Sequence, residues 1–78
     1  MNVKVLFFAS LREAAGTRQL DLSLDAPTTL RGLAERLERS HHLALSGSLC
    51  AVNEHYAAPE SLLADGDTVA FFPPVSGG

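Results

Sequence analysis

The chain has 78 residues, enough for one small domain, because independent domains typically contain roughly 100–150 residues. Apolar residues make up 46% of the sequence, so we expect a globular fold and exclude a disordered chain. Six Lys and Arg against nine Asp and Glu give a net charge of −3. Nucleic acid is therefore not expected as a partner, since its binding depends on clustered cations.

The first half of the chain predicts two strands joined by a short helical turn. Residues 3–9 and 17–24 both alternate with a period of two, which is typical of strands. Between them, residues 11–15 favour a helix and Gly16 suits the residue that ends it. A short connection of this kind predicts that the two strands pair in antiparallel fashion.

The one long helix is predicted to follow Pro27, with Thr28 or Thr29 as its N-cap. Its apolar positions recur at helical spacing: Leu30, Leu33, Ala34 and Leu37. Ion pairs between residues four apart are expected on its exposed side: Arg31 with Glu35, and Glu35 with Arg39.

The second half predicts three more strands. In chain order we expect a polar loop at 40–48, a buried strand at 49–52, a turn and brief strand at 53–57, a helical turn at 61–64, a tight turn at 65–67 and a strand at 68–72. The complete order predicts an α+β fold, a sheet with one face covered by one helix. Residues 1–72 form this domain, and residues 73–78 form an extended C-terminal tail.

The tail carries the strongest functional signal. It consists of Pro73, Pro74, Val75, Ser76, Gly77 and Gly78. Its six residues span at most about 20 Å, and its prolines favour an extended form with little entropy to lose on insertion. Two glycines make the thinnest backbone that a chain can offer. A stiff stem with a slim tip suits insertion into another protein's active site, with the terminal carboxylate as the reacting group. The alternative is an ordinary frayed terminus.

Strand alternation also predicts a docking surface. If Val3, Val5, Phe7, Val69 and Phe71 face the helix, the opposite face of the sheet carries Leu6, Phe8, Ala70 and Phe72. Exposed aromatic side chains in such a patch are typical anchors of an interface. The alternative is that Phe8 and Phe72 pack into a minor cluster under loops.

Other reactive residue types point to no second site. Cys50 lies in an apolar run and is expected to be an inert thiol, and a lone cysteine is typical of a reducing compartment, here the cytoplasm. His41 and His42 have no third ligand at metal spacing, so no metal is expected. No apolar run reaches the roughly 18–20 residues that cross a bilayer, and the N-terminus lacks a signal-peptide pattern. We therefore expect no membrane partner.

The sequence resembles a known family over its whole length. Four segments carry the resemblance: the ending DGDTVAFFPPVSGG at 65–78, AVN at 51–53, VLFFA at 5–9 and LRE at 11–13. They are similar to the small subunits of molybdopterin synthase, of the MoaD type, which are ubiquitin-like sulfur carriers. The resemblance implies a β-grasp fold, with a mixed sheet of four to five strands.

The resemblance also implies a chemistry. A ubiquitin-activating-type enzyme would consume ATP to adenylate the Gly78 carboxylate, and a sulfurtransferase or cysteine desulfurase would convert it to a thiocarboxylate. The tail would then enter the large synthase subunit, in a heterotetramer of two small and two large subunits, and donate sulfur to cyclic pyranopterin monophosphate. Catalytic groups would belong to that subunit, and no cofactor is expected on this chain. Partner-binding residues implied by the resemblance are Phe8, Arg12, Tyr56 and Phe72.

Three alternatives remain open at the level of sequence. A thiamine-type sulfur carrier also ends in Gly-Gly, but is not expected to carry the spacer FFPPVS. A ubiquitin-like protein tag shares the activation step and would form isopeptides through Gly78. A bare interaction domain would have no chemistry at its C-terminus.

Overall fold

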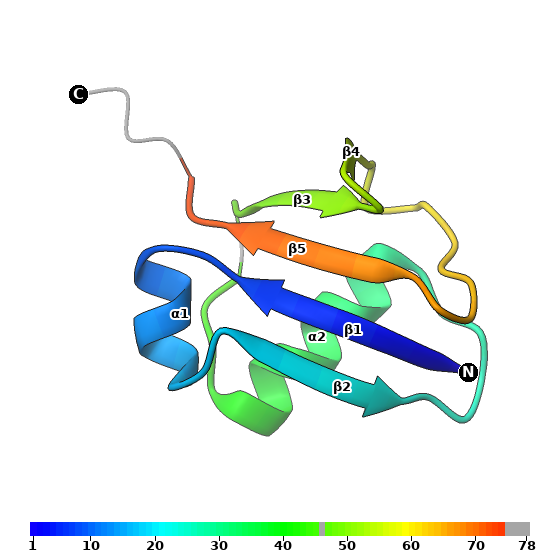
Figure 1. The fold of residues 1–78 in the computed structure, drawn as a ribbon, viewed down its shortest axis with the longest axis horizontal. Helices are drawn as coiled ribbons and strands as arrows, with labels where there is room; N and C mark the ends of the chain where they lie inside the picture. The colour runs from blue at the N-terminus through cyan, green and yellow to red at the C-terminus, as the bar shows by residue number, and fades with distance from the viewer. Residues whose placement is uncertain (46, 75–78) are drawn as a thin grey trace.

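The computed structural model describes residues 1–45 and 47–74. Within them the chain forms two helices and five strands (Figure 1). In chain order these are β1 (Asn2–Phe7), α1 (Ser10–Ala15), β2 (Gln19–Ser23), α2 (Leu30–His41), β3 (Leu49–Val52), β4 (His55–Tyr56) and β5 (Thr68–Phe72). This order confirms the predicted α+β class and each predicted strand.

The strands form one mixed sheet in the order β2-β1-β5-β3-β4. Strand β1 pairs antiparallel with β2, as predicted, and parallel with β5. Strand β5 is therefore central, with β1 on one side and β3 on the other. The last strand in the chain is thus held by two neighbours along its length.

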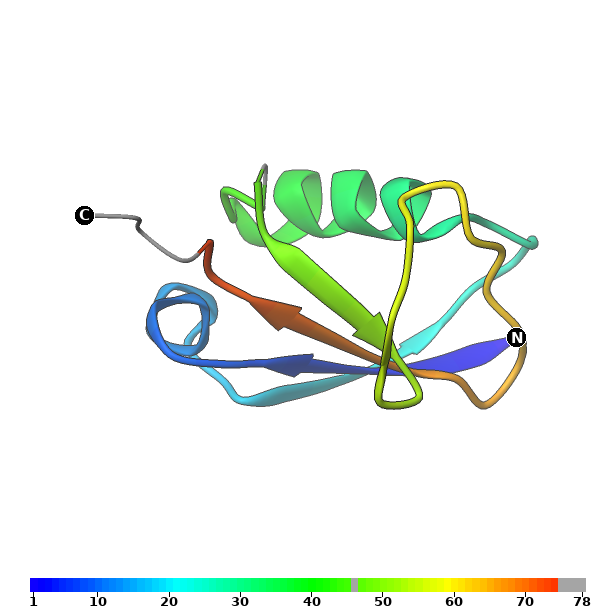
Figure 2. The same ribbon diagram turned by 90° about the horizontal axis from the view of Figure 1, so that it is seen from above.

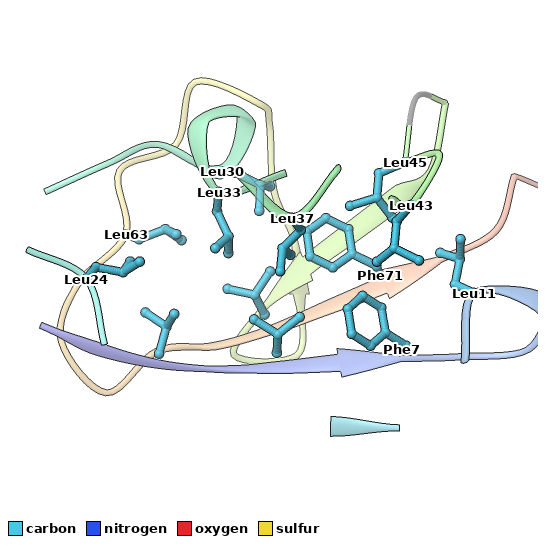
Figure 3. Close-up of a cluster of buried hydrophobic side chains, with 13 residues drawn as sticks. Phe7, Leu11, Leu24, Leu30, Leu33, Leu37, Leu43, Leu45, Leu63 and Phe71 are labelled. Atoms are coloured by element: carbon cyan, nitrogen blue, oxygen red, sulfur yellow. The ribbon is translucent and has the colours of Figure 1, made fainter. Parts of the chain in front are cut away.

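Helix α2 lies across one side of the sheet (Figure 2), which we call the inner face. The strand residues predicted to face the helix are all buried, with exposed fractions of 3% or less: Val3, Val5, Phe7, Val69 and Phe71. Helix α2 contributes three buried leucines: Leu30, Leu33 and Leu37. Figure 3 shows the Phe7 and Phe71 rings on the sheet side of this core and the α2 leucines on the other side. The predicted inner face is confirmed.

The segment predicted as a polar loop at 40–48 is partly core. Helix α2 continues to His41 and ends at His42 in the left-handed conformation, with φ 55°. Leu43 and Leu45 beyond it are only 5% exposed and belong to the central cluster. The backbone amide of Leu45 donates to Glu38 Oε2 at 2.9 Å, which ties the segment back to α2. The polar composition of the segment concealed these two apolar positions.

The helical turn predicted at 61–64 is wrong. Leu62 forms an antiparallel bridge with Thr29 instead. The carbonyl of Ser61 accepts from the amide of Leu30 at 2.9 Å, and that of Pro59 accepts from Arg31 at 2.9 Å. The first amides of a helix have no partner within it. The segment therefore supplies carbonyls to the start of α2, where Thr29 Oγ1 also accepts from Gly32 N at 3.1 Å.

The exposed charges of α2 do not pair as predicted. Arg31 Nη2 lies 3.1 Å from Glu60 Oε1. Within the described residues, Glu35 is within ion-pair distance of neither Arg31 nor Arg39. The same segment that caps α2 brings Glu60 to it. Among residues 1–45 and 47–74, no helix is long and apolar enough to cross a membrane.

Candidate docking face and tail exit

The side of the sheet away from α2, which we call the outer face, follows from the strand register. In the parallel pair β1 and β5, Leu6 lies across from Ala70. Both side chains point away from α2, because alternate residues of a strand point to opposite faces, and their neighbours Phe7 and Phe71 are buried. No helix of the described chain lies across this face (Figure 2). The predicted assignment of the two faces is confirmed.

Phe8 and Phe72 form a stacked pair on the outer face. Their ring centroids are 4.7 Å apart and the rings are inclined by 10°. The pairing follows from the register, since the Phe8 amide donates to the Phe71 carbonyl at 3.2 Å. Phe8 is 42% exposed, so the alternative in which it packs under loops is wrong. Phe72 is half-buried, so the pair presents mainly the Phe8 ring to solvent.

Tyr56 extends this surface from the neighbouring strand. It lies across from Ala51 in the β3–β4 hairpin and is 78% exposed. One hollow on the outer face is lined by Leu6, Phe8, Ala51, Asn53, Glu54, Tyr56, Thr68, Ala70 and Phe72. The structure therefore brings three of the four predicted partner-binding residues around one hollow. Their role in binding stays a prediction.

Arg12 does not line this hollow. It is exposed on α1 and lines a separate, smaller hollow with Ala9, Ser10 and Glu13. Helix α1 stands at the end of the sheet where β5 ends (Figure 1). Arg12 is thus placed near the exit of the chain rather than among the aromatic side chains.

Strand β5 loses both neighbours at its C-terminal end. On one side β1 ends at Phe7, and the chain turns away at Ala9 with φ 52°. On the other side β3 begins at Leu49, opposite Phe72. Pro73 and Pro74 follow and have no amide hydrogen to pair with a strand. The chain therefore leaves the sheet after Phe72, while Val75, Ser76, Gly77 and Gly78 lie outside the described residues, and the division at 72/73 stays a prediction.

The exposure of Leu49 and the position of Glu54 were not predicted. Leu49 was expected in a buried strand but is 42% exposed at the start of β3, opposite Phe72, and it lines a second hollow with residues of α2. All four residues of β3 are apolar, so alternation gives no signal there. Glu54 lines the hollow from the β3–β4 turn, and no sequence pattern pointed to it.

The tight turn predicted at 65–67 is confirmed, and its carboxylates bind backbone. Asp65 Oδ1 accepts from the Asn2 amide at 2.7 Å, and Asp67 Oδ2 accepts from the Ala64 amide at 2.7 Å. Asp67 Oδ1 also accepts from Asn53 Nδ2 at 2.9 Å. In the part of the chain that the structure describes, no three His, Cys, Asp or Glu side chains cluster to hold a metal ion.

Cys50 lies on the inner side of β3, opposite Phe71. It is partly buried against the core, and desolvation raises the pKa of its thiol. Since the thiolate is the nucleophile, this environment lowers its reactivity. The prediction that Cys50 carries no sulfur-transfer chemistry is consistent with this position, although the side chain is less buried than expected.

Comparison with known proteins gives matches over the whole chain. The ThiS family matches residues 5–78. The molybdopterin synthase sulfur carrier subunit of Escherichia coli is 41% identical, over 97% of this chain and 99% of that protein. The corresponding subunit of Mycobacterium tuberculosis is 33% identical, over 100% of this chain and 99% of its own length.

Solved structures confirm the β-grasp, ubiquitin-like fold. SAMP1 from Haloferax volcanii superposes with a TM-score of 0.83 at 28% identity, with 100% of each chain covered. A chain of the complex of subunits 1 and 2 of molybdopterin-converting factor from Helicobacter pylori gives a TM-score of 0.71 at 27% identity, again over 100% of each chain.

Proposed function

The chain belongs to the ThiS family, and we propose that it is the sulfur carrier subunit of a molybdopterin synthase. The observation that carries this proposal is the full-length similarity to proteins of that name from bacteria and eukaryotes. The outer face supports it, because Phe8 stacks there on Phe72, the last residue of the strand that leads directly into the Gly-Gly tail. The names of the relatives favour this function over a thiamine-type carrier.

The chemistry that we propose takes place at Gly78. An activating enzyme joins the carboxylate to AMP from ATP and releases pyrophosphate. A sulfurtransferase or cysteine desulfurase supplies sulfur at the oxidation level of sulfide, which bonds to the Gly78 carbonyl carbon as the bond to AMP breaks and leaves a thiocarboxylate. Its sulfur then bonds to a carbon of cyclic pyranopterin monophosphate in the large subunit, and water cleaves the bond between sulfur and the Gly78 carbonyl, which restores the carboxylate. Two such deliveries build the dithiolene. This chain supplies the nucleophile and its position, while the acid–base groups belong to the large subunit.

Docking in this proposal uses the outer face. Phe8, Tyr56 and Phe72 anchor the large subunit, Arg12 contributes at the exit of the chain, and residues 73–78 insert into the partner. The two-subunit complex from Helicobacter pylori supports a partner of this kind. We propose a heterotetramer of two small and two large subunits that works in the cytoplasm.

Intact mass spectrometry tests the proposed carrier chemistry. The chain is incubated with ATP, a molybdopterin-synthase activating enzyme and a sulfur source. We expect one oxygen to be exchanged for sulfur, and deletion of Gly78 to abolish the change. Omission of ATP is the matched control. An unchanged mass with an enzyme that is active on its own carrier would contradict the proposal.

A second candidate is a protein modifier attached through Gly78. It is favoured by the similarity to H. volcanii small archaeal modifier protein 1, with a TM-score of 0.83 at 27% identity. Activation by adenylation is common to both functions, so the test lies in the acceptor. Ladders of conjugates in cells that express the tagged chain, lost when Gly78 is deleted, would favour the modifier.

A further inference from the structure

The turn between β3 and β4 consists of two residues with positive φ. Asn53 has φ 51° and Glu54 has φ 71°. A two-residue hairpin turn of this kind strongly favours Asn-Gly, because only glycine adopts positive φ without steric cost. The chain has glutamate at the position where glycine is expected.

Side-chain hydrogen bonds account for the asparagine at position 53. Its side-chain Nδ2 donates to Asp67 Oδ1 at 2.9 Å, and its Oδ1 accepts from the Thr68 amide at 3.0 Å. Asparagine also tolerates the left-handed conformation better than most residues. The Glu54 carboxylate, in contrast, has no hydrogen-bond or ion-pair partner among residues 1–45 and 47–74. Nothing in the described fold accounts for a glutamate here.

The positions of the residues with positive φ bear on the role of Glu54. Among residues 1–45 and 47–74, four non-glycine residues have positive φ: Ala9, His42, Asn53 and Glu54. Histidine and asparagine are enriched in that region, whereas alanine and glutamate are not. Ala9 is the residue at which the chain turns into α1, and it lines the separate hollow beside Arg12. Glu54, in contrast, lines the hollow with Phe8, Tyr56 and Phe72. The strained residue that borders the outer face without a structural explanation is therefore Glu54, and such strain collects at functional sites.

We propose that the Glu54 carboxylate is a specificity contact on the rim of the outer face and that it meets a lysine or arginine of the large synthase subunit. This inference rests on the proposed function. Interfaces of this kind combine an apolar, aromatic centre with a polar rim. Phe8, Phe72 and Tyr56 supply the centre, and Glu54 is the charged side chain that lines the same hollow. A rim charge of this type selects partners and speeds their encounter.

Two variants separate a role in docking from a role in the turn. Glu54→Gln removes the charge but keeps the side chain, and Glu54→Gly also gives the turn its preferred residue. Glu35→Gln removes an equal charge from α2, on the opposite side of the sheet, and is the matched control. Affinity for the purified large subunit is measured by calorimetry at low and high salt, and the thermal unfolding midpoint is measured for each variant.

We expect both Glu54 variants to bind the large subunit about two- to fivefold more weakly at low salt, with a smaller salt dependence than wild type. We also expect Glu54→Gly to unfold at a higher temperature than wild type, so that stability and docking change in opposite directions. Glu35→Gln should match wild type in affinity and salt dependence. If Glu54 acted only in the turn, Glu54→Gly would raise the unfolding temperature, and neither Glu54 variant would change the salt dependence of binding.

Wild-type affinity and salt dependence in both Glu54 variants would overturn the proposal and leave the proposed function intact. The proposed function fails separately, if the wild-type chain itself neither binds the large subunit nor gains sulfur at its C-terminus, and the role of Glu54 fails with it. An equal loss of affinity in Glu35→Gln would also overturn the specific role of Glu54, because it would show a general effect of charge.

Discussion

Two phenylalanine pairs lie next to each other at the ends of β1 and β5 and point to opposite faces of the sheet. Phe7 and Phe71 point into the core, with ring centroids 6.2 Å apart and exposed fractions of 2% and 0%. Phe8 and Phe72 follow them by one residue and stack on the outer face at 4.7 Å. The difference comes from the strand period alone, since a shift by one residue moves a side chain to the other face. The same dipeptide thus supplies the core and the proposed docking surface.

The two pairs also differ in what holds them in place. The inner pair belongs to the buried cluster that includes the leucines of α2 (Figure 3), so its removal leaves a cavity. The two rings of the outer pair pack against each other, and stacking of two rings contributes about 0.5–1.5 kcal/mol beyond area burial. We therefore expect mutations of the inner pair to affect the free energy of unfolding, and mutations of the outer pair to affect binding.

The largest effect is expected from Phe71→Ala. This ring is fully buried, and phenylalanine-to-alanine changes in cores typically cost about 3–5 kcal/mol. Urea unfolding followed by circular dichroism measures the change. Point mutations ordinarily change the free energy of unfolding by about 1 kcal/mol. If the free energy of unfolding of the variant lies within about 1 kcal/mol of the wild-type value, the inner pair is not a main element of the core.

A smaller effect, and of a different kind, is expected from Phe72→Ala. We expect affinity for the large subunit to fall by about 2 kcal/mol or more, as for other aromatic anchors, with a much smaller loss of stability than in Phe71→Ala. Calorimetry measures the affinity. Leu62→Ala is the control, because Leu62 is 76% exposed but lies beside the start of α2, away from the hollow. Equal losses of affinity in the two variants would contradict the assignment of the outer face.

The smallest effect concerns Cys50, which lies opposite Phe71 on the inner side. Because burial raises the pKa of its thiol, the folded chain binds this proton more tightly than the unfolded chain. Its contribution to stability is present below the unfolded pKa and is lost as pH rises through the folded pKa. We expect iodoacetamide at mildly alkaline pH to label Cys50 more slowly in the folded chain than in urea. Equal rates would place the thiol in solvent.

Alternation in β1 and β5 was sufficient to predict both faces, because the polar residues Lys4 and Thr68 mark the side that points away from the helix. The same reasoning failed for β3, which contains no charged or hydroxyl side chain to mark one side. Leu43 and Leu45 were missed because they lie between polar residues and reach the core only through the tertiary path of the chain.

Non-local hydrogen bonds account for the remaining differences. Residues 61–64 have a composition that permits a helical turn, yet their backbone groups pair with Thr28 and the start of α2. Such pairing depends on the position of α2 in the fold, and local helix propensity does not predict that position. Glu54 was not predicted for a related reason, since its positive φ follows from the length of the hairpin turn and leaves no mark in composition.

The central position of β5 has a mechanical consequence. A pull on the C-terminal end of this strand acts along the axes of β1 and β5, which run parallel, so all of their mutual hydrogen bonds resist the force together in shear. A strand at the edge of the sheet, pulled sideways, would instead release its bonds one after another. A force on the C-terminus is therefore expected to break these hydrogen bonds together, at a higher load than if β5 lay at the edge of the sheet.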